Sequence, residues 1–219
     1  MTEGTSIRAV AATEVNLAAR AMEAGELVVV PTGRWYMICC DASNADACAR
    51  IFTAKQRPVE KSLLLVARSV EAASQQFRMS MDATLLAEAF WPGDLALLLS
   101  WRDPAEGLRY SAVGAPEALV TVAPGVLGEL AQLASCPVAA TSANISGTTL
   151  RRPSITLAEV QGFIAETGAE VPVVVDGGIC PTANHVTIVR CGNDRTELVR
   201  DGIVHTRAIR AALGRELST

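Results

Sequence analysis

The chain has 219 residues, half of them hydrophobic, and a formal net charge of −4 at pH 7. This length and apolar content suffice for a sizeable hydrophobic core, which excludes a disordered chain. No apolar run reaches the roughly 18–20 residues of a membrane span, and residues 1–10 lack the basic start and apolar stretch of a secretion signal. We therefore expect a cytoplasmic protein with no membrane partner, and the net charge gives no general attraction to nucleic acid.

Helix and strand patterns alternate from the start of the chain. Residues 13–24 are rich in helix formers and residues 26–30 form an apolar run, which predicts a helix followed by a buried strand. A second helix is predicted from Ser43 as its cap, with Asp46 three residues later. The apolar positions of this helix share one face, as the spacing of Ala47, Ile51 and Ala54 shows.

The same alternation continues to the C-terminus. Apolar runs predict strands at residues 63–66, 95–99, 119–122, 138–140, 171–175, 186–189 and 197–199. Helices are predicted from about residue 69, over 82–90 and 126–134, from the capping box Thr156-Leu-Ala-Glu159 to about residue 166, and at the C-terminus. Because no repeat, low-complexity tract or linker interrupts this pattern, we predict one α/β domain with a mixed sheet.

The cysteines and histidines give no metal-binding pattern. No CxxC pair occurs and several cysteines lie in apolar runs, so we interpret all six as buried free thiols: Cys39, Cys40, Cys48, Cys136, Cys180 and Cys191. His185 and His205 have no pairing of the usual zinc spacing with these cysteines. The sequence therefore predicts no metal site made of Cys or His, and a Ser-His triad has few histidines to draw on.

The use of lysine singles out one segment. Seventeen of the nineteen basic residues are arginine, and the only two lysines, Lys55 and Lys61, lie six positions apart with Arg57 between them. An ammonium is a compact, rotatable point charge, whereas a guanidinium is a planar fork. A site in which the cation has to stay in contact with a phosphoryl or carbonyl oxygen as that oxygen moves can therefore require lysine. Residues 55–61 are a candidate for such chemistry, and the alternative is a solvated turn after the second helix.

A polar loop follows one of the predicted strands. Thr141–Gly147 comes directly after the apolar run 138–140, and α/β folds place ligands where loops leave buried strands. Ser142 supplies a hydroxyl, Asn144 supplies an amide, and a terminal glycine permits a tight turn, so the loop can cradle a phosphate. The alternative is a helix-capping turn. Neither a GxxxxGK[ST] run nor a GxGxxG fingerprint is present, which excludes ordinary P-loop and Rossmann mechanisms.

Taken in order, these segments resemble the motifs of the YrdC/Sua5 family, which includes threonylcarbamoyl-AMP synthases. The matching stretches are residues 25–36 (G-x-x-x-x-x-P-T-x-T-x-Y), 41–62 (C-D-x-x-N…I-F-x-x-K-x-R-P-x-x-K-P), 91–93 (W-P-G), 141–147 (T-S-A-N-x-S-G), 176–178 (D-G-G) and 200–202 (R-x-G). The resemblance implies an α/β fold in a single YrdC-like domain over residues 1–219. It also implies a twisted mixed sheet with surrounding helices and a basic cleft.

The resemblance further implies an ATP-dependent nucleotidyltransferase that works without a P-loop. In the family's reaction an amino acid's amine combines with bicarbonate, and the carbamate oxygen attacks the α-phosphate of ATP and releases pyrophosphate. With threonine as the amine, the product is L-threonylcarbamoyl-AMP, whose carbamoyl group passes to adenosine-37 of certain tRNAs through partner proteins of tRNA modification. Mg²⁺ is expected to accompany ATP, although the sequence shows no protein ligand for it.

Functional positions of the family transfer onto this sequence residue by residue. Lys55, Arg57 and Lys61 are the expected catalytic cations, because phosphoryl transfer is catalysed chiefly by positioning and by neutralising charge. The nucleotide is expected to contact Lys55, Arg57, Ser142, Asn144 and Arg200. The amino-acid substrate is expected to contact Thr32, Arg34, Tyr36, Thr121, Thr141 and Thr187.

Departures from the family patterns cluster on the amino-acid side. Arg34 stands where the family has its second opening threonine, Met37 where it has a glycine, Thr121 where it has an arginine, and Val186 where it has a serine. Arg34 could take over the substrate carboxylate from the missing arginine. Otherwise the acceptor is another amine or the carbamoyl donor is carbamoyl phosphate, and a non-catalytic RNA-binding module is a further alternative.

Overall fold

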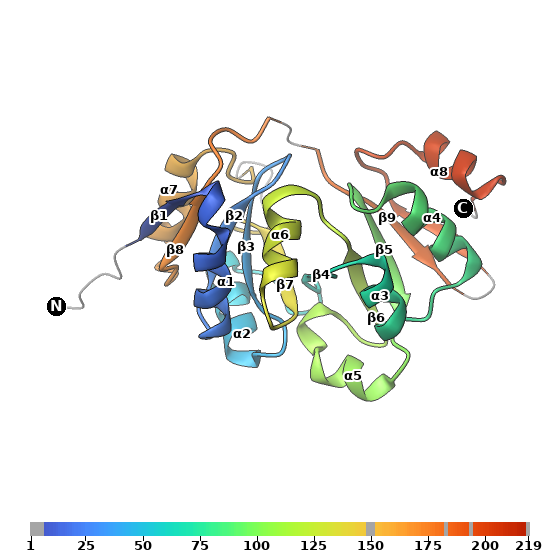
Figure 1. The fold of residues 1–219 in the computed structure, drawn as a ribbon, viewed down its shortest axis with the longest axis horizontal. Coiled ribbons are helices and arrows are strands. Elements are labelled where there is room, and N and C mark those ends of the chain that lie inside the picture. Colours follow the sequence, from blue (N-terminus) through green and yellow to red (C-terminus); the bar gives the residue numbers. More distant parts are fainter. Residues whose placement is uncertain (1–6, 148–151, 182–183, 193–194, 218–219) are drawn as a thin grey trace. The chain divides into compact units, whose positions relative to one another are not determined.

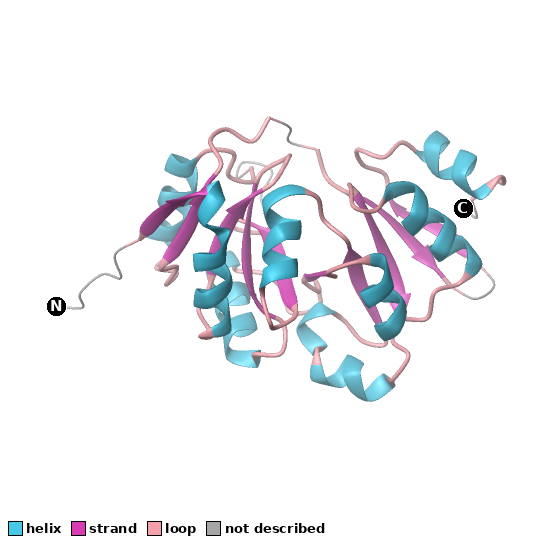
Figure 2. Ribbon diagram, in the orientation of Figure 1, coloured by secondary structure: helices cyan, strands magenta, loops and turns pink. Residues whose placement is uncertain are grey.

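The computed structural model describes residues 7–147, 152–181, 184–192 and 195–217. These residues form two compact units, the first made of residues 7–61 and 125–181, and the second of residues 62–124 and the described residues from 184 onward. In each unit, strands form an open sheet with helices packed against it (Figures 1 and 2). The α/β class, the mixed sheet and the surrounding helices are thereby confirmed, whereas the single domain over residues 1–219 stays a prediction.

The sheet of the first unit has the strand order β1-β8-β2-β3-β7. Its strands are β1 (Arg8–Ala11), β2 (Val28–Pro31), β3 (Tyr36–Asp41), β7 (Val138–Ser142) and β8 (Val173–Asp176). The pairings of β8 with β1 and β2 are parallel, and those of β3 with β2 and β7 are antiparallel. Every residue of β2 and all but the last of β3 are buried, as expected for central strands covered on both faces.

Helices cover this sheet. In the described part of the first unit they are α1 (Val15–Glu23), preceded by the short 3₁₀ turn η1 (Ala12–Glu14), α2 (Ala45–Lys55), α6 (Gly125–Leu133) and α7 (Leu157–Thr167). Helix α1 packs against α6, and α2 packs against α7 and β3. The apolar positions predicted to face the core on α2 do so, since Ala47, Ile51 and Ala54 are at most 5% exposed.

Strand register brings three loops to one edge of the first unit's sheet. Pro31 at the end of β2 pairs with Tyr36, and Met37 next to it pairs with Ser142 at the end of β7. The parallel partner β8 ends at Asp176, in register with the end of β2. The loops that leave β2, β7 and β8 therefore meet at the carboxyl ends of these strands, where α/β sheets bind ligands.

The strands of the second unit pair in the order β4-β6-β5-β9-β10, with both parallel and antiparallel neighbours. Its strands are β4 (Leu64–Val66), β5 (Leu95–Ser100), β6 (Glu117–Thr121), β9 (Thr187–Cys191) and β10 (Thr196–Arg200). Its helices are α3 (Val70–Gln76), α4 (Met81–Phe90), α5 (Pro104–Arg109), the 3₁₀ turn η2 (Ser111–Val113) and α8 (Thr206–Leu213). Helix α8, the predicted C-terminal helix, packs against α4.

The predicted helix starts are confirmed in two places and wrong in one. Ser69 caps α3, and the Thr156–Glu159 capping box at the start of α7 is fully formed. Helix α2 is capped by Asn44, whose Oδ1 accepts the Ala47 N–H at 3.0 Å, and not by Ser43 as predicted. The Ser43 hydroxyl donates instead to Asp41 at 2.7 Å, because the chain leaving β3 places that carboxylate first within its reach.

Two strands and one α-helix have no counterpart in the sequence prediction: β1, β3 and α5. Strand β1 buries only one of its four residues, so its apolar pattern is weak, while β3 is a continuous apolar run without alternation. Helix α5 has six residues and buries only Gly107. Low burial explains why periodicity did not reveal β1 and α5, whereas the apolar run of β3 resembles the run 26–30 and should have predicted a strand in the same way.

The cysteines are free thiols, and five of the six are buried, with Cys136 half-buried. The interpretation as buried thiols is confirmed for those five. Within the described ranges, three or more His, Cys, Asp or Glu side chains nowhere gather closely enough to hold a metal ion. No helix in the described part of the chain is long and apolar enough to cross a membrane.

Candidate functional site

Helix α2 ends at Lys55 in a sharp turn. The next residue, Gln56, adopts the left-handed conformation with φ 46° and caps the helix through its N–H bonds to Phe52 and Thr53 carbonyls. A non-glycine residue rarely takes this conformation, so the turn is held by its surroundings. As a result Lys55 lies within the last helical turn, and Arg57 lies beyond it.

The side chain of Lys55 is only 1% exposed and reaches the loop that follows β7. Its Nζ donates to the carbonyl oxygen of Ser142, to the carbonyl oxygen of Asn144 at 2.7 Å and to Asn144 Oδ1 at 3.1 Å. An ammonium has three N–H donors and no acceptor, so all three donors are used. The Ser146 N–H also donates to the Lys55 carbonyl at 2.7 Å, and Lys55 thus holds the loop by four hydrogen bonds.

Ser142 and Asn144 fix each other within this loop. The Ser142 hydroxyl donates to Asn144 Oδ1 at 2.7 Å, and Asn144 Nδ2 donates to the Ile145 carbonyl at 3.0 Å. Asn144 Oδ1 therefore accepts from both Lys55 and Ser142, which sets the orientation of its amide. These bonds hold the Ser142 hydroxyl and the Asn144 amide in fixed orientations at the end of β7.

Two opposing effects act on the protonation of Lys55. Burial, and secondarily the nearby Arg57 guanidinium, lower the pKa of Lys55 to about 7. The three oxygen acceptors around Nζ act in the opposite direction, because hydrogen bonds to the charged form favour it. A neutral amine has only two N–H donors for these three oxygens, so the geometry fits the ammonium, and we assign the charged form to Lys55.

Arg57 and Lys61 lie in a different environment from Lys55. The half-buried Arg57 donates from Nε to the Lys61 carbonyl at 2.7 Å, and the Lys61 N–H donates to the Pro58 carbonyl at 3.0 Å. These bonds close a turn that leaves Lys61 exposed to solvent. The two lysines that the sequence singled out therefore differ, since one is a buried anchor and the other an exposed cation.

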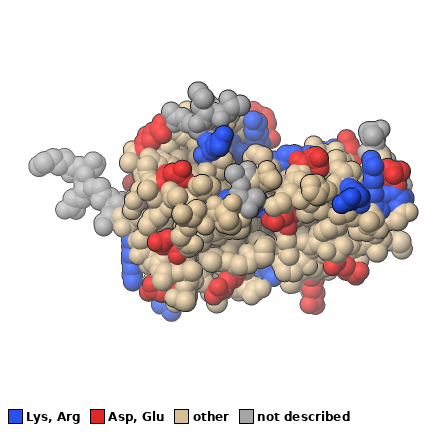
Figure 3. Space-filling view, turned by 90° about the horizontal axis from the view of Figure 1, so that it is seen from above, with Lys and Arg blue, Asp and Glu red and all other residues tan. Residues whose placement is uncertain are grey.

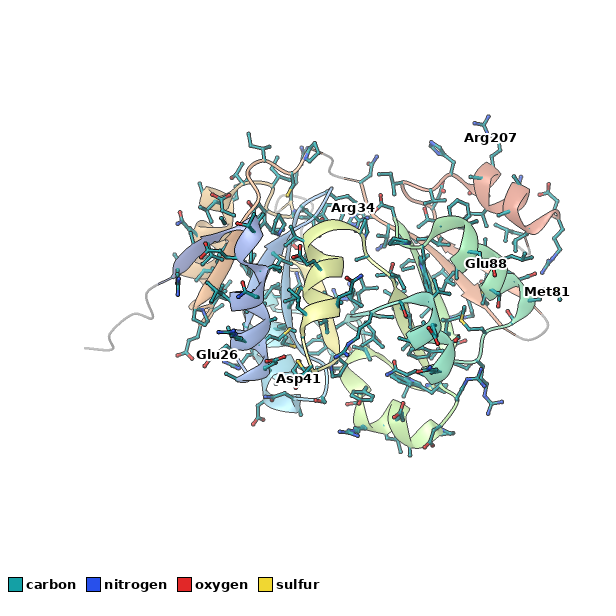
Figure 4. The ribbon with its side chains drawn as sticks, in the orientation of Figure 1. Glu26, Arg34, Asp41, Met81, Glu88 and Arg207 are labelled. Atoms are coloured by element: carbon teal, nitrogen blue, oxygen red, sulfur yellow. The ribbon has the colours of Figure 1, made fainter. Side chains whose placement is uncertain are left out.

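Thr32 shapes the turn between β2 and β3. Its hydroxyl donates to the Trp35 carbonyl at 2.7 Å and accepts from the N–H groups of Arg34 and Trp35 at 3.2 and 3.3 Å. Arg34, labelled in Figure 4, is 7% exposed. Its guanidinium lies 5.5 Å from the centroid of the Trp35 ring, within range of a cation–π interaction. Thr32 therefore stabilises the turn that carries Arg34.

Nine of the residues predicted for the site lie in the first unit: Thr32, Arg34, Tyr36, Lys55, Arg57, Lys61, Thr141, Ser142 and Asn144. Hydrogen bonds join Lys55 with Ser142 and Asn144, and others join Thr32 with Arg34 and Arg57 with Lys61. Tyr36 and Thr141 are buried in the paired strands β3 and β7, with exposed fractions of 0% and 8%. Contact of these two residues with a substrate stays a prediction.

The other three predicted residues lie in the second unit. The Thr121 hydroxyl donates to the Leu95 carbonyl at 2.8 Å, and the Thr187 hydroxyl donates to the Val204 carbonyl at 2.7 Å. Both threonines are at most 3% exposed, so these hydroxyls hold the unit's own strands and loops. Arg200 is half-buried, its Nε donates to a backbone carbonyl at 3.1 Å, and burial lowers the pKa of Arg200. Substrate contact by these three residues stays a prediction.

Ser154 is a site residue that sequence reasoning missed. It is 4% exposed, and its hydroxyl donates at 2.7 Å to the carbonyl of Ala143, between Ser142 and Asn144. Its own carbonyl accepts the Tyr36 N–H at 2.8 Å. No pattern in the sequence marks Ser154, because a single serine after a proline is typical of any loop.

Charges of both signs are interspersed over the face drawn in Figure 3. Lysine and arginine side chains lie among aspartates and glutamates there, and uncharged residues cover most of the surface. The basic cleft implied by the resemblance therefore stays a prediction.

Comparisons with known proteins identify the family of this chain. The Sua5/YciO/YrdC family, described as telomere recombination, matches residues 20–202, so the chain belongs to this family. Threonylcarbamoyl-AMP synthase of Bacillus subtilis is 28% identical over 208 residues, covering 92% of this chain and 57% of that protein. The Vibrio cholerae enzyme of the same name is 33% identical over 167 residues, covering 72% of this chain and 81% of the relative.

Solved structures extend the comparison to the fold. Pyrococcus abyssi Sua5 complexed with L-threonine matches with a TM-score of 0.83 and 26% identity, over 97% of this chain and 62% of that one. Escherichia coli YciO matches at 15% identity with a TM-score of 0.72, which supports the fold alone. The chain spans less than two thirds of the length of the Bacillus and Pyrococcus relatives.

Replacing Lys55 should destabilise the protein, whereas replacing Lys61 should not. Lys55→Met leaves the Ser142 and Asn144 oxygens buried without their donor, so we expect a loss of about 2–4 kcal/mol of unfolding free energy. Lys61→Met removes an exposed charge and should stay within about 0.5 kcal/mol of wild type. Urea unfolding of the three proteins measures both changes, and equal stability of the two variants would contradict the anchoring role of Lys55.

Proposed function

We propose that this chain is a nucleotidyltransferase that forms L-threonylcarbamoyl-AMP from threonine, bicarbonate and ATP and releases pyrophosphate. The observation that carries the proposal is the fixed arrangement of Ser142 and Asn144 on the Lys55 ammonium, in a chain whose relatives are named threonylcarbamoyl-AMP synthases. The product would supply its carbamoyl group to adenosine-37 of tRNA in the cytoplasm, through partner proteins of tRNA modification.

The proposed reaction has two balanced steps. The amine of threonine attacks bicarbonate and yields a carbamate and water. A carbamate oxygen then attacks the α-phosphorus of ATP, a new O–P bond forms, and the bond to the β-phosphate oxygen breaks with pyrophosphate as the leaving group. Both steps gain from fixed positions and from cations that neutralise developing charge, and neither requires a covalent intermediate on the protein.

The roles of the cations follow from their environments. In this proposal the exposed Lys61 and the half-buried Arg57 contact the phosphate groups and the carbamate. Lys55 acts indirectly in this proposal, through the loop rather than by contact with the substrate, because its donors already bind Ser142 and Asn144. There it holds both residues in place and supplies a fixed positive charge close to the phosphates, which a preorganised site requires.

Mg²⁺ enters this proposal only as the counter-ion that ATP brings. The described residues include no group of three His, Cys, Asp or Glu side chains suited to a metal ion. A site with cationic and amide groups does not fit a protein-held Mg²⁺, which binds carboxylates and phosphate oxygens. We therefore derive no step through a metal bound by the protein.

Arg34 is the proposed anchor for the carboxylate of the amino acid. It is a nearly buried guanidinium in the turn fastened by Thr32, and a guanidinium presents a planar fork that matches a carboxylate. The contact of the guanidinium with the Trp35 ring limits the orientations of the fork. The complex of the Pyrococcus abyssi relative with L-threonine supports an amino acid as a substrate of this chain.

A panel of possible substrates tests the proposed function. The protein is incubated with ATP, bicarbonate and one amino acid at a time, with carbamoyl phosphate in a separate reaction, and adenylates are identified by mass spectrometry. We expect threonylcarbamoyl-AMP and stoichiometric pyrophosphate with threonine, and neither product from an Asn144→Ala control.

Other outcomes of the panel would contradict the proposal. An adenylate formed with a different amine, or from carbamoyl phosphate alone, would reassign the substrate. Salt-dependent tRNA binding without any turnover of ATP would favour the RNA-binding alternative, since contacts to phosphates weaken as salt rises.

Arg34 variants test the amino-acid side separately from the nucleotide side. Arg34→Ala should raise the KM for threonine at least about tenfold, which corresponds to about 1.4 kcal/mol, and leave the KM for ATP within about twofold. Arg34→Lys keeps the charge but loses the planar fork, so its KM for threonine should lie between those of the wild type and Arg34→Ala. Steady-state kinetics of all three proteins decide the matter, and unchanged threonine kinetics in both variants would remove Arg34 from the site.

A further inference from the structure

Tyr36 begins β3 and connects two loops through its backbone. Its N–H donates to the Ser154 carbonyl at 2.8 Å, and its carbonyl accepts the Ala143 N–H at 2.9 Å. The Ser154 N–H and hydroxyl both donate to the Ala143 carbonyl, at 3.2 and 2.7 Å. The backbone of Tyr36 is therefore part of the support for the loop that carries Ser142 and Asn144.

The phenol of Tyr36 reaches a third loop, the turn Asp176–Gly178 at the end of β8. Its hydroxyl donates to the Gly178 carbonyl at 2.9 Å and accepts the Gly177 N–H at 3.2 Å. Asp176 Oδ1 lies 3.3 Å from the same hydroxyl and accepts the Gly178 N–H at 2.9 Å. The single O–H donor of the phenol is therefore engaged by this turn, which also supplies a donor to its oxygen.

The turn in contact with the phenol packs directly on the residue before Thr32. A Cβ atom at Gly177 would lie 2.5 Å from Pro31 Cγ, so only glycine permits this approach, and Gly178 has a positive φ of 74°. Pro31 leads into the turn that carries Thr32 and Arg34. A shift of Asp176–Gly178 would therefore be transmitted to that turn.

Direct contact between Tyr36 and a ligand does not fit this geometry. The residue is 0% exposed, and its hydroxyl bonds to the Asp176–Gly178 turn. Burial also raises the pKa of Tyr36, so the phenol remains protonated near neutral pH. A side chain so placed can influence a substrate only through the groups that it holds.

We propose that Tyr36 is a positioning residue that aligns the Thr32–Arg34 turn with the Ser142–Asn144 loop by holding the Asp176–Gly178 turn in place. The inference rests on the proposed function, because it concerns how the amino-acid side of that site is set relative to its nucleotide side. The phenol acts on the amino-acid side, and the backbone of Tyr36 acts on the nucleotide side.

Tyr36→Phe separates these two actions, because it removes the hydroxyl and keeps the ring and the backbone. The matched control is Tyr110→Phe, since Tyr110 is the only other tyrosine in the chain and its ring stacks on Trp101 in the second unit. Amide hydrogen exchange over residues 176–180 should become at least about fivefold faster in Tyr36→Phe, and should not change in Tyr110→Phe. This readout does not depend on any enzymatic activity.

Steady-state kinetics are the second measurement. A residue that only stabilised the fold would not raise the KM for threonine while leaving the KM for ATP unchanged. In Tyr36→Phe the KM for threonine should rise at least about fivefold while the KM for ATP stays within about twofold, because the backbone support of the Ser142–Asn144 loop is unchanged. Gly177→Ala perturbs the same turn where it packs on Pro31. It should likewise raise the KM for threonine and leave the KM for ATP nearly unchanged.

The outcomes separate the inference from the proposed function. Unchanged exchange over residues 176–180, or equal increases in both KM values, would overturn the positioning role of Tyr36. A wild-type protein without synthase activity, together with faster exchange in Tyr36→Phe, would overturn the proposed function and uphold the role of the hydroxyl in holding the turn.

Discussion

A buried ammonium must be surrounded by acceptors, and this requirement organises the site at the end of α2. Moving an unpaired charge out of water is costly, so a lysine that is 1% exposed is stable only when its three donors are satisfied. Here the acceptors come from the loop after β7, which has to adopt one conformation to supply them. The rigidity of Ser142 and Asn144 therefore follows from the burial of Lys55.

The sheet of the first unit determines which other loops lie at the same edge as the loop held by Lys55. Strands β2, β7 and β8 deliver their loops to one edge, and Tyr36 at the start of β3 bonds to residues of two of them, Ala143 and Gly178. Hydrogen bonds within the turn of Thr32, and close packing of Gly177 on Pro31, then place Arg34. Hydrogen bonds and close packing in this way connect the proposed nucleotide side of the site with its proposed amino-acid side.

Sequence patterns predicted the elements and the site segments better than they predicted the roles of single residues. The scarcity of lysine led to Lys55, but a charged residue gives no sign in the sequence that it will be buried, and its partners are far along the chain. Thr121 stands where the family has an arginine and Thr187 lies in a late family pattern, and both hydroxyls bond to backbone carbonyls that only the folded strands bring near, so their substrate contact stays a prediction. The cap of α2 moved from Ser43 to Asn44 because two adjacent residues were both able to cap, and the position of Asp41 decided between them.

The most direct test of the central claim is the nitrogen-15 NMR spectrum of the lysine ammonium groups. Ammonium protons are observed only when they exchange slowly with water, and the chain has just two lysines, so assignment needs one variant of each. The buried, triply bonded Lys55 should give one sharp ammonium signal that is lost in Lys55→Met and kept in Lys61→Met. An absent signal, or one that survives Lys55→Met, would contradict the claim that this ammonium anchors the loop of Ser142 and Asn144.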